Sequence, residues 1–177
     1  TEYLTAADRY NAFDWAAEFP NLLVSRSFSK AYGLAGLRIG FGVAQPGITD
    51  LLNRIRQPFN VNSMAQAAAA AALFDEEFLK RSQRVNQEGL AQLASAISSM
   101  GLSFIPSWGN FLLVKVGDAP DAGLGLFKAL LAKGVITRPV ANYDLPQWLR
   151  ISVGTSEENE KCIAAMKAVL PSLRSAA

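Results

Sequence analysis

The chain has 177 residues, of which 50% are hydrophobic and 18% are charged, and its formal net charge is +2. This composition is typical of a globular protein with a substantial core. The 17 Lys and Arg residues are scattered, so we expect no nucleic-acid partner. No apolar run approaches about 20 residues, so we expect no membrane span. The chain has no histidine, which excludes histidine-based catalysis and imidazole metal sites. Its single cysteine, Cys162, excludes an internal disulfide and favours a reducing, cytoplasmic location.

The first half of the chain alternates short strand-like and helical segments. Periodicity and turn residues predict a helix over 11–18, strands over 21–27 and 38–44, and helices over 48–56, 64–74 and 75–100. The alanine-rich segment 64–74 favours a helix intrinsically. Gly101 is placed to cap the last of these helices.

After Gly101 the pattern changes to short strands that are interrupted by two helices. We expect strands over 102–105, 111–116, 135–137 and 148–153, and a helix marked by Leu124, Phe127 and Leu131. Thr155 and Glu158 form a capping-box pattern before a final helix. These elements predict a two-layer α+β unit in which Cys162 is a core thiol.

Lys30 is the most informative position in the sequence. It lies in the segment 27–40 (SFSKAYGLAGLRIG), where small hydroxyl side chains precede it and two glycines and Arg38 follow it. A primary amine can attack an aldehyde to form an imine, which is a strong electron sink. Arg38, Ser27 and Ser29 can together bind a phosphate dianion. The segment therefore predicts imine chemistry with a phosphorylated aldehyde cofactor, and the alternative is a surface lysine in a polar loop.

Arg150 forms a second candidate site because it lies within the apolar strand predicted over 148–153. A guanidinium among apolar neighbours needs an anion, which is either an incoming ligand or a local carboxylate such as Asp144. Arg138 precedes Pro139 in a loop and is either a second anion contact or a solvated side chain.

The segment 27–40 closely resembles the cofactor-lysine segment of the fold-type I aminotransferases that depend on pyridoxal phosphate. Within that superfamily it is most similar to the histidinol-phosphate aminotransferases. The resemblance covers essentially the whole chain and includes 57–62 (QPFNVN), 109–111 (GNF), 137–140 (TRPV) and 148–155 (WLRISVGT). It implies an α/β fold of PLP-dependent transferase fold type I. Residues 1–87 resemble the C-terminal part of its large domain and residues 88–177 its small C-terminal α+β domain.

The resemblance also implies roles for individual residues. Lys30 is similar to the lysine that forms a Schiff base with pyridoxal 5'-phosphate, and Ser27, Ser29 and Arg38 are similar to the ligands of the cofactor phosphate. The resemblance implies substrate contacts at three further positions. Arg150 is similar to the arginine that binds the substrate's anionic group, Arg138 to a second anion contact, and Asn110 to a residue close to the substrate.

The implied reaction transfers an amino group between L-histidinol phosphate and 2-oxoglutarate in histidine biosynthesis, and the implied enzyme is a cytoplasmic homodimer with no metal. The family's enzymes are longer, and their ring-nitrogen aspartate and glycine-rich phosphate loop match no part of this chain. We therefore expect the chain, as a C-terminal half, to be inactive alone. Three alternatives stay open, namely another fold-type I aminotransferase such as an aromatic one, a phosphothreonine decarboxylase, and a non-catalytic association domain.

Overall fold

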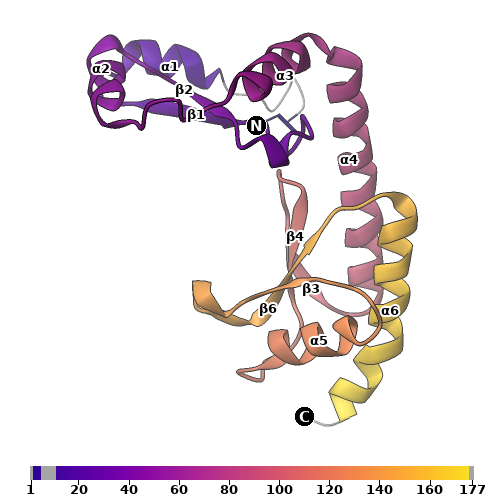
Figure 1. The fold of residues 1–177 in the computed structure, drawn as a ribbon. Helices are drawn as coiled ribbons and strands as arrows, with labels where there is room; N and C mark the ends of the chain where they lie inside the picture. Colours follow the sequence, from indigo (N-terminus) through magenta and orange to yellow (C-terminus); the bar gives the residue numbers. More distant parts are fainter. Residues whose placement is uncertain (1, 5–10, 176–177) are drawn as a thin grey trace. The chain divides into compact units, whose positions relative to one another are not determined.

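The computed structural model describes residues 2–4 and 11–175, and it divides into two units, 1–83 and 84–177 (Figure 1). Each unit is described by itself. The boundary falls inside the long helix α4 (Glu76–Ser99), as does the predicted division between residues 87 and 88. Among the described residues, no helix combines the length and the apolar character that a membrane span requires.

Unit 1 contains a two-stranded antiparallel sheet with short helices. Its elements are α1 (Ala12–Glu18), β1 (Leu23–Ser27), the 3-10 turn η1 (Ala35–Leu37), β2 (Gly40–Ala44), α2 (Pro46–Ile55) and α3 (Ser63–Phe74). In the register of the sheet Ser27 lies opposite Gly40. Gly40 fits there because a Cβ atom at this position would lie only 2.6 Å from the carbonyl oxygen of Arg26. The predicted helices and strands of this half are confirmed, with boundaries that differ by one or two residues.

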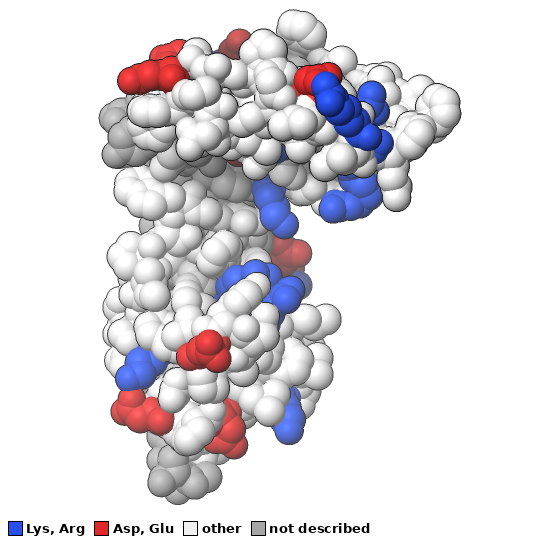
Figure 2. Space-filling view, turned by 90° about the vertical axis from the view of Figure 1, so that its left-hand side faces the viewer, with Lys and Arg blue, Asp and Glu red and all other residues white. Residues whose placement is uncertain are grey.

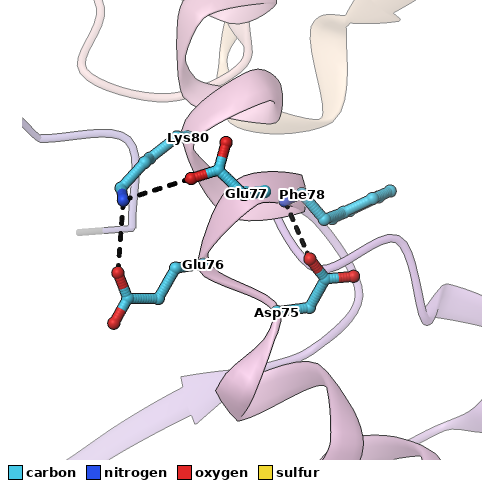
Figure 3. A network of polar contacts seen from close by, with 5 residues as sticks. All are labelled: Asp75, Glu76, Glu77, Phe78 and Lys80. Atoms are coloured by element: carbon cyan, nitrogen blue, oxygen red, sulfur yellow. Dashed lines mark hydrogen bonds and ion pairs between the residues drawn. The ribbon is translucent and has the colours of Figure 1, made fainter.

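The helices α3 and α4 each begin with a side-chain cap. The Asn62 side chain accepts a hydrogen bond from the Ala65 amide at 2.8 Å, and Asp75 accepts one from the Phe78 amide at 3.0 Å. In Figure 3, Lys80 also lies between Glu76 and Glu77, with ion pairs of 3.2 and 3.5 Å, and the bond to Glu76 raises the pKa of Lys80. These fully exposed ion pairs support the first turn of α4 locally.

Unit 2 is a four-stranded antiparallel sheet packed against helices. The strand order is β3-β4-β6-β5, and the elements are β3 (Ser103–Ile105), β4 (Phe111–Lys115), α5 (Ala122–Leu131), β5 (Arg138–Val140), the 3-10 turn η2 (Ala141–Tyr143), β6 (Leu145–Ser152) and α6 (Ser156–Ser175). The helices α4 and α6 run side by side beside this sheet (Figure 1). The predicted two-layer α+β unit is confirmed.

The core of unit 2 lies between the helices and one face of the sheet. It contains Leu93 and Ile97 of α4, Leu126 and Leu130 of α5, Leu112 and Val114 of β4, Leu149 and Ile151 of β6, and Cys162 and Met166 of α6. Alternation along the strands places the intervening residues of β4 and β6 on the opposite face of the sheet. Burial raises the pKa of the Cys162 thiol, so the predicted core thiol is confirmed.

The turns of unit 2 follow the sequence signals closely, with one exception. Gly101 and Gly134 both have positive φ, 71° and 76°, and end α4 and α5. The strand predicted over 135–137 is wrong, because the Val135 amide caps α5 by donating to the Leu130 carbonyl at 3.0 Å. The strand β5 therefore begins only at Arg138.

The predicted capping box at the start of α6 is confirmed. The Thr155 amide donates to the Glu158 carboxylate at 2.8 Å, and the Glu158 amide donates back to the Thr155 hydroxyl at 3.3 Å. The bond from the Thr155 amide is the main cause of a lowered pKa of Glu158.

On the face drawn in Figure 2, charged side chains form small separate groups among uncharged surface.

Candidate functional site

The loop that follows β1 is held down by one aromatic side chain. Phe28 is buried, and its ring lies 5.0 Å from that of Tyr32 and 5.8 Å from that of Phe41. Its amide donates to the Ile39 carbonyl at 3.2 Å, and its carbonyl accepts from the Leu34 amide at 2.9 Å. These contacts fix the backbone on both sides of Phe28, where Ser27 and Ser29 lie.

Ser27, Ser29 and Arg38 form one polar cluster in unit 1. The Ser27 hydroxyl accepts a hydrogen bond from the Ser29 amide at 3.1 Å, and the Ser29 hydroxyl accepts one from Nη1 of Arg38 at 3.4 Å. Because both hydroxyls act as acceptors here, each keeps its own proton to donate to a ligand. The cluster therefore offers two hydroxyl donors and a guanidinium at one place, which is a donor set suited to a phosphate dianion.

Arg38 has a backbone conformation that the sequence did not reveal. It was predicted as the first residue of a strand over 38–44, but it follows η1 in the left-handed region with φ of 51°, and β2 begins only at Gly40. Its Nη1 atom also donates to the Ala35 carbonyl at 2.8 Å, which folds the side chain back over its own turn. A non-glycine residue in this region costs about 1–3 kcal/mol, and such residues gather at ligand-binding sites.

Lys30 lies on the same loop as this cluster. The Lys30 side chain is exposed, which is what the alternative of a surface lysine expects. Lys30 also directly follows Ser29, whose hydroxyl contacts Arg38, and this is what the prediction of an anion site expects. The Lys30 carbonyl accepts from the Gly33 amide at 2.9 Å, and Gly33 takes a positive φ of 70° close to the Phe78 ring. Gly33 is thus required by the turn, whereas Gly36 has open space where its Cβ would be.

The second candidate site lies in unit 2, where β5 pairs with β6. Arg138 and Arg150 are directly opposite each other in the register of these strands. Nε of Arg150 is buried without a hydrogen-bond partner, and the guanidinium lies 5.3 Å from the centre of the Phe111 ring. Like charges directly opposite across a sheet are destabilising. The pair is therefore an arrangement that an anion would stabilise.

Among the described residues, no carboxylate forms an ion pair with Arg150. Asp144, which the sequence offered as a partner, is exposed at the end of η2 with φ of 58°. Within residues 2–4 and 11–173, whose side chains the structure describes, none of the ion pairs involves Arg138 or Arg150. The prediction that Arg150 needs an anion therefore finds no carboxylate of the described residues to satisfy it.

Asn110 directly precedes β4, the strand in which Leu113 lies opposite Arg150. It is half-buried, and its backbone carbonyl accepts a hydrogen bond from the Val153 amide at 2.9 Å, just after β6. It therefore belongs to the strand ends next to Phe111 and Arg150.

Two residues near the arginine pair were missed by the sequence interpretation. Phe111 provides the ring below Arg150, and the hydroxyl of Thr137 is buried without a hydrogen-bond partner directly before Arg138. The alternation of β4 could have indicated Phe111, since it shares a face with Leu113, which lies opposite Arg150. Thr137 begins the segment 137–140 that carries the family resemblance, but no sequence pattern predicted that its hydroxyl is buried. The described residues contain no group of three potential metal ligands.

A comparison with known families assigns the chain to one of them. A family model described as aminotransferase class I and II matches residues 3–166, which include every candidate residue above. The chain belongs to the class I and II aminotransferase family.

Among its aminotransferase relatives, histidinol-phosphate aminotransferase 2 of Ralstonia nicotianae is 60% identical over 99% of this chain. Histidinol-phosphate aminotransferase 1 of Cupriavidus pinatubonensis is 60% identical over 96% of it. The chain spans about half the length of these curated relatives, 47% and 45%.

A solved aminotransferase has the same fold. The histidinol-phosphate aminotransferase of Sinorhizobium meliloti, solved in complex with pyridoxal-5'-phosphate, is 31% identical, with a TM-score of 0.88 over 97% of this chain and 47% of its own. The prediction of fold type I is therefore confirmed.

Proposed function

We propose that this chain carries the cofactor lysine and the substrate-anion site of a transaminase. The enzyme would transfer an amino group between L-histidinol phosphate and 2-oxoglutarate in histidine biosynthesis. The observation that carries the proposal is the Ser27, Ser29 and Arg38 cluster, which lies on the same loop as Lys30, the residue that directly follows Ser29. The names of the relatives at 60% identity support the substrate.

The donor set fits pyridoxal 5'-phosphate. Two hydroxyls and a guanidinium would hold its phosphate, and the neighbouring Lys30 amine would reach its aldehyde. When bound, this cofactor supplies an aldehyde that condenses with amines and a conjugated ring that stabilises negative charge at the substrate α-carbon. In the proposed role, Nζ of Lys30 would take the proton from the α-carbon of the substrate and would deliver it to the carbon that carried the cofactor's aldehyde oxygen.

Arg150 and Arg138 would hold the anionic end of each substrate. Histidinol phosphate presents a phosphate and 2-oxoglutarate presents a carboxylate, and a planar guanidinium binds either with two parallel hydrogen bonds. The Phe111 ring would keep the Arg150 head in place between the two half-reactions. Asn110 would contribute a polar contact at the same strand ends.

The activity would belong to a chain of the relatives' full length, because this chain covers less than half of the relatives named above. In the same proposal residues 1–87 contribute to the large cofactor-binding domain and residues 88–177 form the small domain. The whole enzyme would be a cytoplasmic homodimer. The exposed apolar side chains of unit 1, such as Ile55, Phe59 and Phe74, support burial against further protein. Sedimentation of the full-length protein tests the dimer.

Steady-state kinetics of the full-length protein test the reaction. We expect Lys30→Ala to lower kcat by at least about 10²–10⁴-fold, because a positioned proton carrier contributes this much. Arg150→Lys should raise KM for histidinol phosphate by about 10- to 100-fold, since a charge-assisted hydrogen bond is worth about 1.5–3 kcal/mol. The exposed Lys128→Ala is the matched control and should leave both constants unchanged.

The outcomes separate the alternatives. Turnover of aromatic amino acids without turnover of histidinol phosphate would assign a different aminotransferase. Release of carbon dioxide from phosphothreonine would assign a decarboxylase. Full activity of Lys30→Ala would contradict the proposed role of Lys30.

A further inference from the structure

Two buried asparagines in unit 2 connect its helices to the loops beside the arginine pair. Asn86 of α4 is 6% exposed and Asn159 of α6 is 2% exposed, and they are the buried polar residues among the described part of the chain. Both occupy positions on the apolar stripes of their helices, where Leu93 and Met166 lie two turns further on. An amide at such a position gives up solvent hydrogen bonds and has to regain them inside the protein.

Asn86 holds the loop that precedes β4. Its Nδ2 atom donates to the Gly109 carbonyl at 3.0 Å, and the Gly109 amide donates to the Ser107 hydroxyl at 3.0 Å. The next residue, Asn110, accepts from the Val153 amide at 2.9 Å. The backbone that leads to Phe111 is therefore fixed from the helix on one side and from the end of β6 on the other.

Asn159 holds the chain that follows β6. Its Oδ1 atom accepts from the Gly154 amide at 2.9 Å, and its Nδ2 atom donates to Oε1 of Gln92 on α4 at 3.0 Å. Gly89 on α4 makes room for this contact. A Cβ atom there would lie 2.4 Å from Val153 Cγ1 and 2.9 Å from Asn159 Nδ2. The two helices and both loops thus form one connected polar network.

Packing alone does not account for these amides. The Oδ1 atom of Asn86 is buried without a hydrogen-bond partner among the described residues. A buried acceptor without a partner is less favourable than an apolar side chain of similar size. The bonds that the two amides make to the backbone lead to Gly109, two residues before Phe111, and to Gly154, four residues after Arg150.

We propose that Asn86 and Asn159 are positioning residues for the substrate-anion site. They hold the backbone at Gly109 and Gly154, and thereby fix the strand ends that carry Phe111 and Arg150. This inference rests on the proposed function, because it takes Arg150 as the ligand of the substrate's anion. A guanidinium binds an anion through two parallel hydrogen bonds, so its affinity depends on its position. A shift of the strand that carries Arg150 would therefore weaken the binding of both substrate anions.

The test uses inorganic phosphate as the probe and ¹⁵N-labelled full chain. The Nε–H resonance of Arg150, assigned with Arg150→Lys, reports phosphate binding during a titration. We expect Asn86→Ala and Asn159→Ala each to weaken phosphate binding by about 10-fold, as displaced supporting residues commonly do. The matched control, Val169→Ala, removes core volume from α6 away from both loops and should change the affinity by less than about twofold.

A second measurement does not depend on how stable the variants are. If the network and the anion site are coupled, phosphate binding must in turn stabilise the network, because coupling is reciprocal. In the unaltered chain, saturating phosphate should slow hydrogen exchange of the Gly154 amide, whereas the Gly134 amide in the turn after α5 should be unaffected.

Each result decides the proposal. Unchanged phosphate affinity in both asparagine variants would overturn it, and so would an equal loss in Val169→Ala, which would indicate a purely structural role. Unchanged exchange of Gly154 would overturn it as well. Absence of any phosphate effect at Arg150 in the unaltered chain would refute the anion site itself, and thus the proposed function rather than the positioning role alone.

Discussion

The two units of the chain bury their apolar side chains to very different extents. Unit 2 has a continuous core shared by three helices and the central strands of its sheet. In unit 1 the buried apolar side chains among the described residues are small or few, namely Ala16, Phe28, Ala31, Ala65 and Ala69. Many large apolar side chains of unit 1 are exposed instead, including Leu51, Ile55, Phe59, Met64 and Phe74.

This difference separates a unit that is complete by itself from one that is not. A four-stranded sheet with helices on one face can bury a core alone, whereas an isolated two-stranded sheet is marginally stable. The Lys30 loop is nevertheless held in unit 1 by backbone hydrogen bonds around Phe28. Local geometry at the Lys30 loop is thus set by the sequence nearby, while its stability depends on more protein than unit 1 contains.

Hydrogen exchange gives the largest expected contrast. Amides of β4 and β6 in unit 2 should exchange at least about 10³-fold more slowly than amides of β1 and β2 in unit 1, because core strands open only with the whole unit. Mass spectrometry of peptides from each unit measures the two rates in the same sample. Equal protection in the two sheets would contradict the comparison.

A matched pair of leucine substitutions sharpens the comparison between the two units. Leu149→Ala removes a fully buried side chain from β6, and we expect it to lower the free energy of unfolding by about 2–5 kcal/mol. Leu51→Ala, at 60% exposure on α2, should change it by less than about 0.5 kcal/mol. Urea denaturation followed by circular dichroism compares them. If Leu51→Ala is as costly as Leu149→Ala, the exposed side of unit 1 is covered in solution.

The smallest effect concerns the capping box of α6. Thr155→Ala should cost about 0.5–2 kcal/mol, since it removes an N-cap hydroxyl. The pKa of Glu158 is lowered in the folded chain, so its charge contributes stability that is present above the ordinary value of 4.5 and is lost as the pH falls through the folded value.

Unfolding measured against pH tests the sign of this effect. The stability difference between the unaltered chain and Glu158→Gln should be greatest near neutral pH and disappear in acid. Glu160→Gln on the same helix is the control and should show no such dependence. A difference that grows in acid would mean that the Glu158 carboxylate is not the group held by Thr155.

Most elements and the polar cluster of the Lys30 loop could be predicted from the sequence, because their signals are local. Apolar periodicity gave the helices and most strands, and Thr155 with Glu158 marked the start of α6. The segment 27–40 brought Lys30, Ser29 and Arg38 to one loop. The strand predicted over 135–137 was wrong because the amide of Val135 is used by the helix before it, a competition that β propensity does not describe.

Other features could not be predicted because they depend on pairing between distant segments. The left-handed conformation of Arg38 is a local exception, which residue preferences did not indicate because non-glycine residues rarely adopt it. The opposition of Arg138 and Arg150 follows from the register of β5 and β6. Asn86 did carry a signal, since a polar residue on the apolar stripe of α4 is unusual, but its partner at Gly109 lies in a loop far along the chain.

Covalent trapping of the cofactor tests the central claim most directly. The full-length protein is incubated with pyridoxal 5'-phosphate and reduced with borohydride, which makes the bond between lysine and cofactor permanent, and the labelled peptide is identified by mass spectrometry. We predict that the label lies on Lys30 among the seven lysines of this chain, and that Arg38→Ala reduces labelling at limiting cofactor. Label on another lysine, or spread evenly over all of them, would contradict the account.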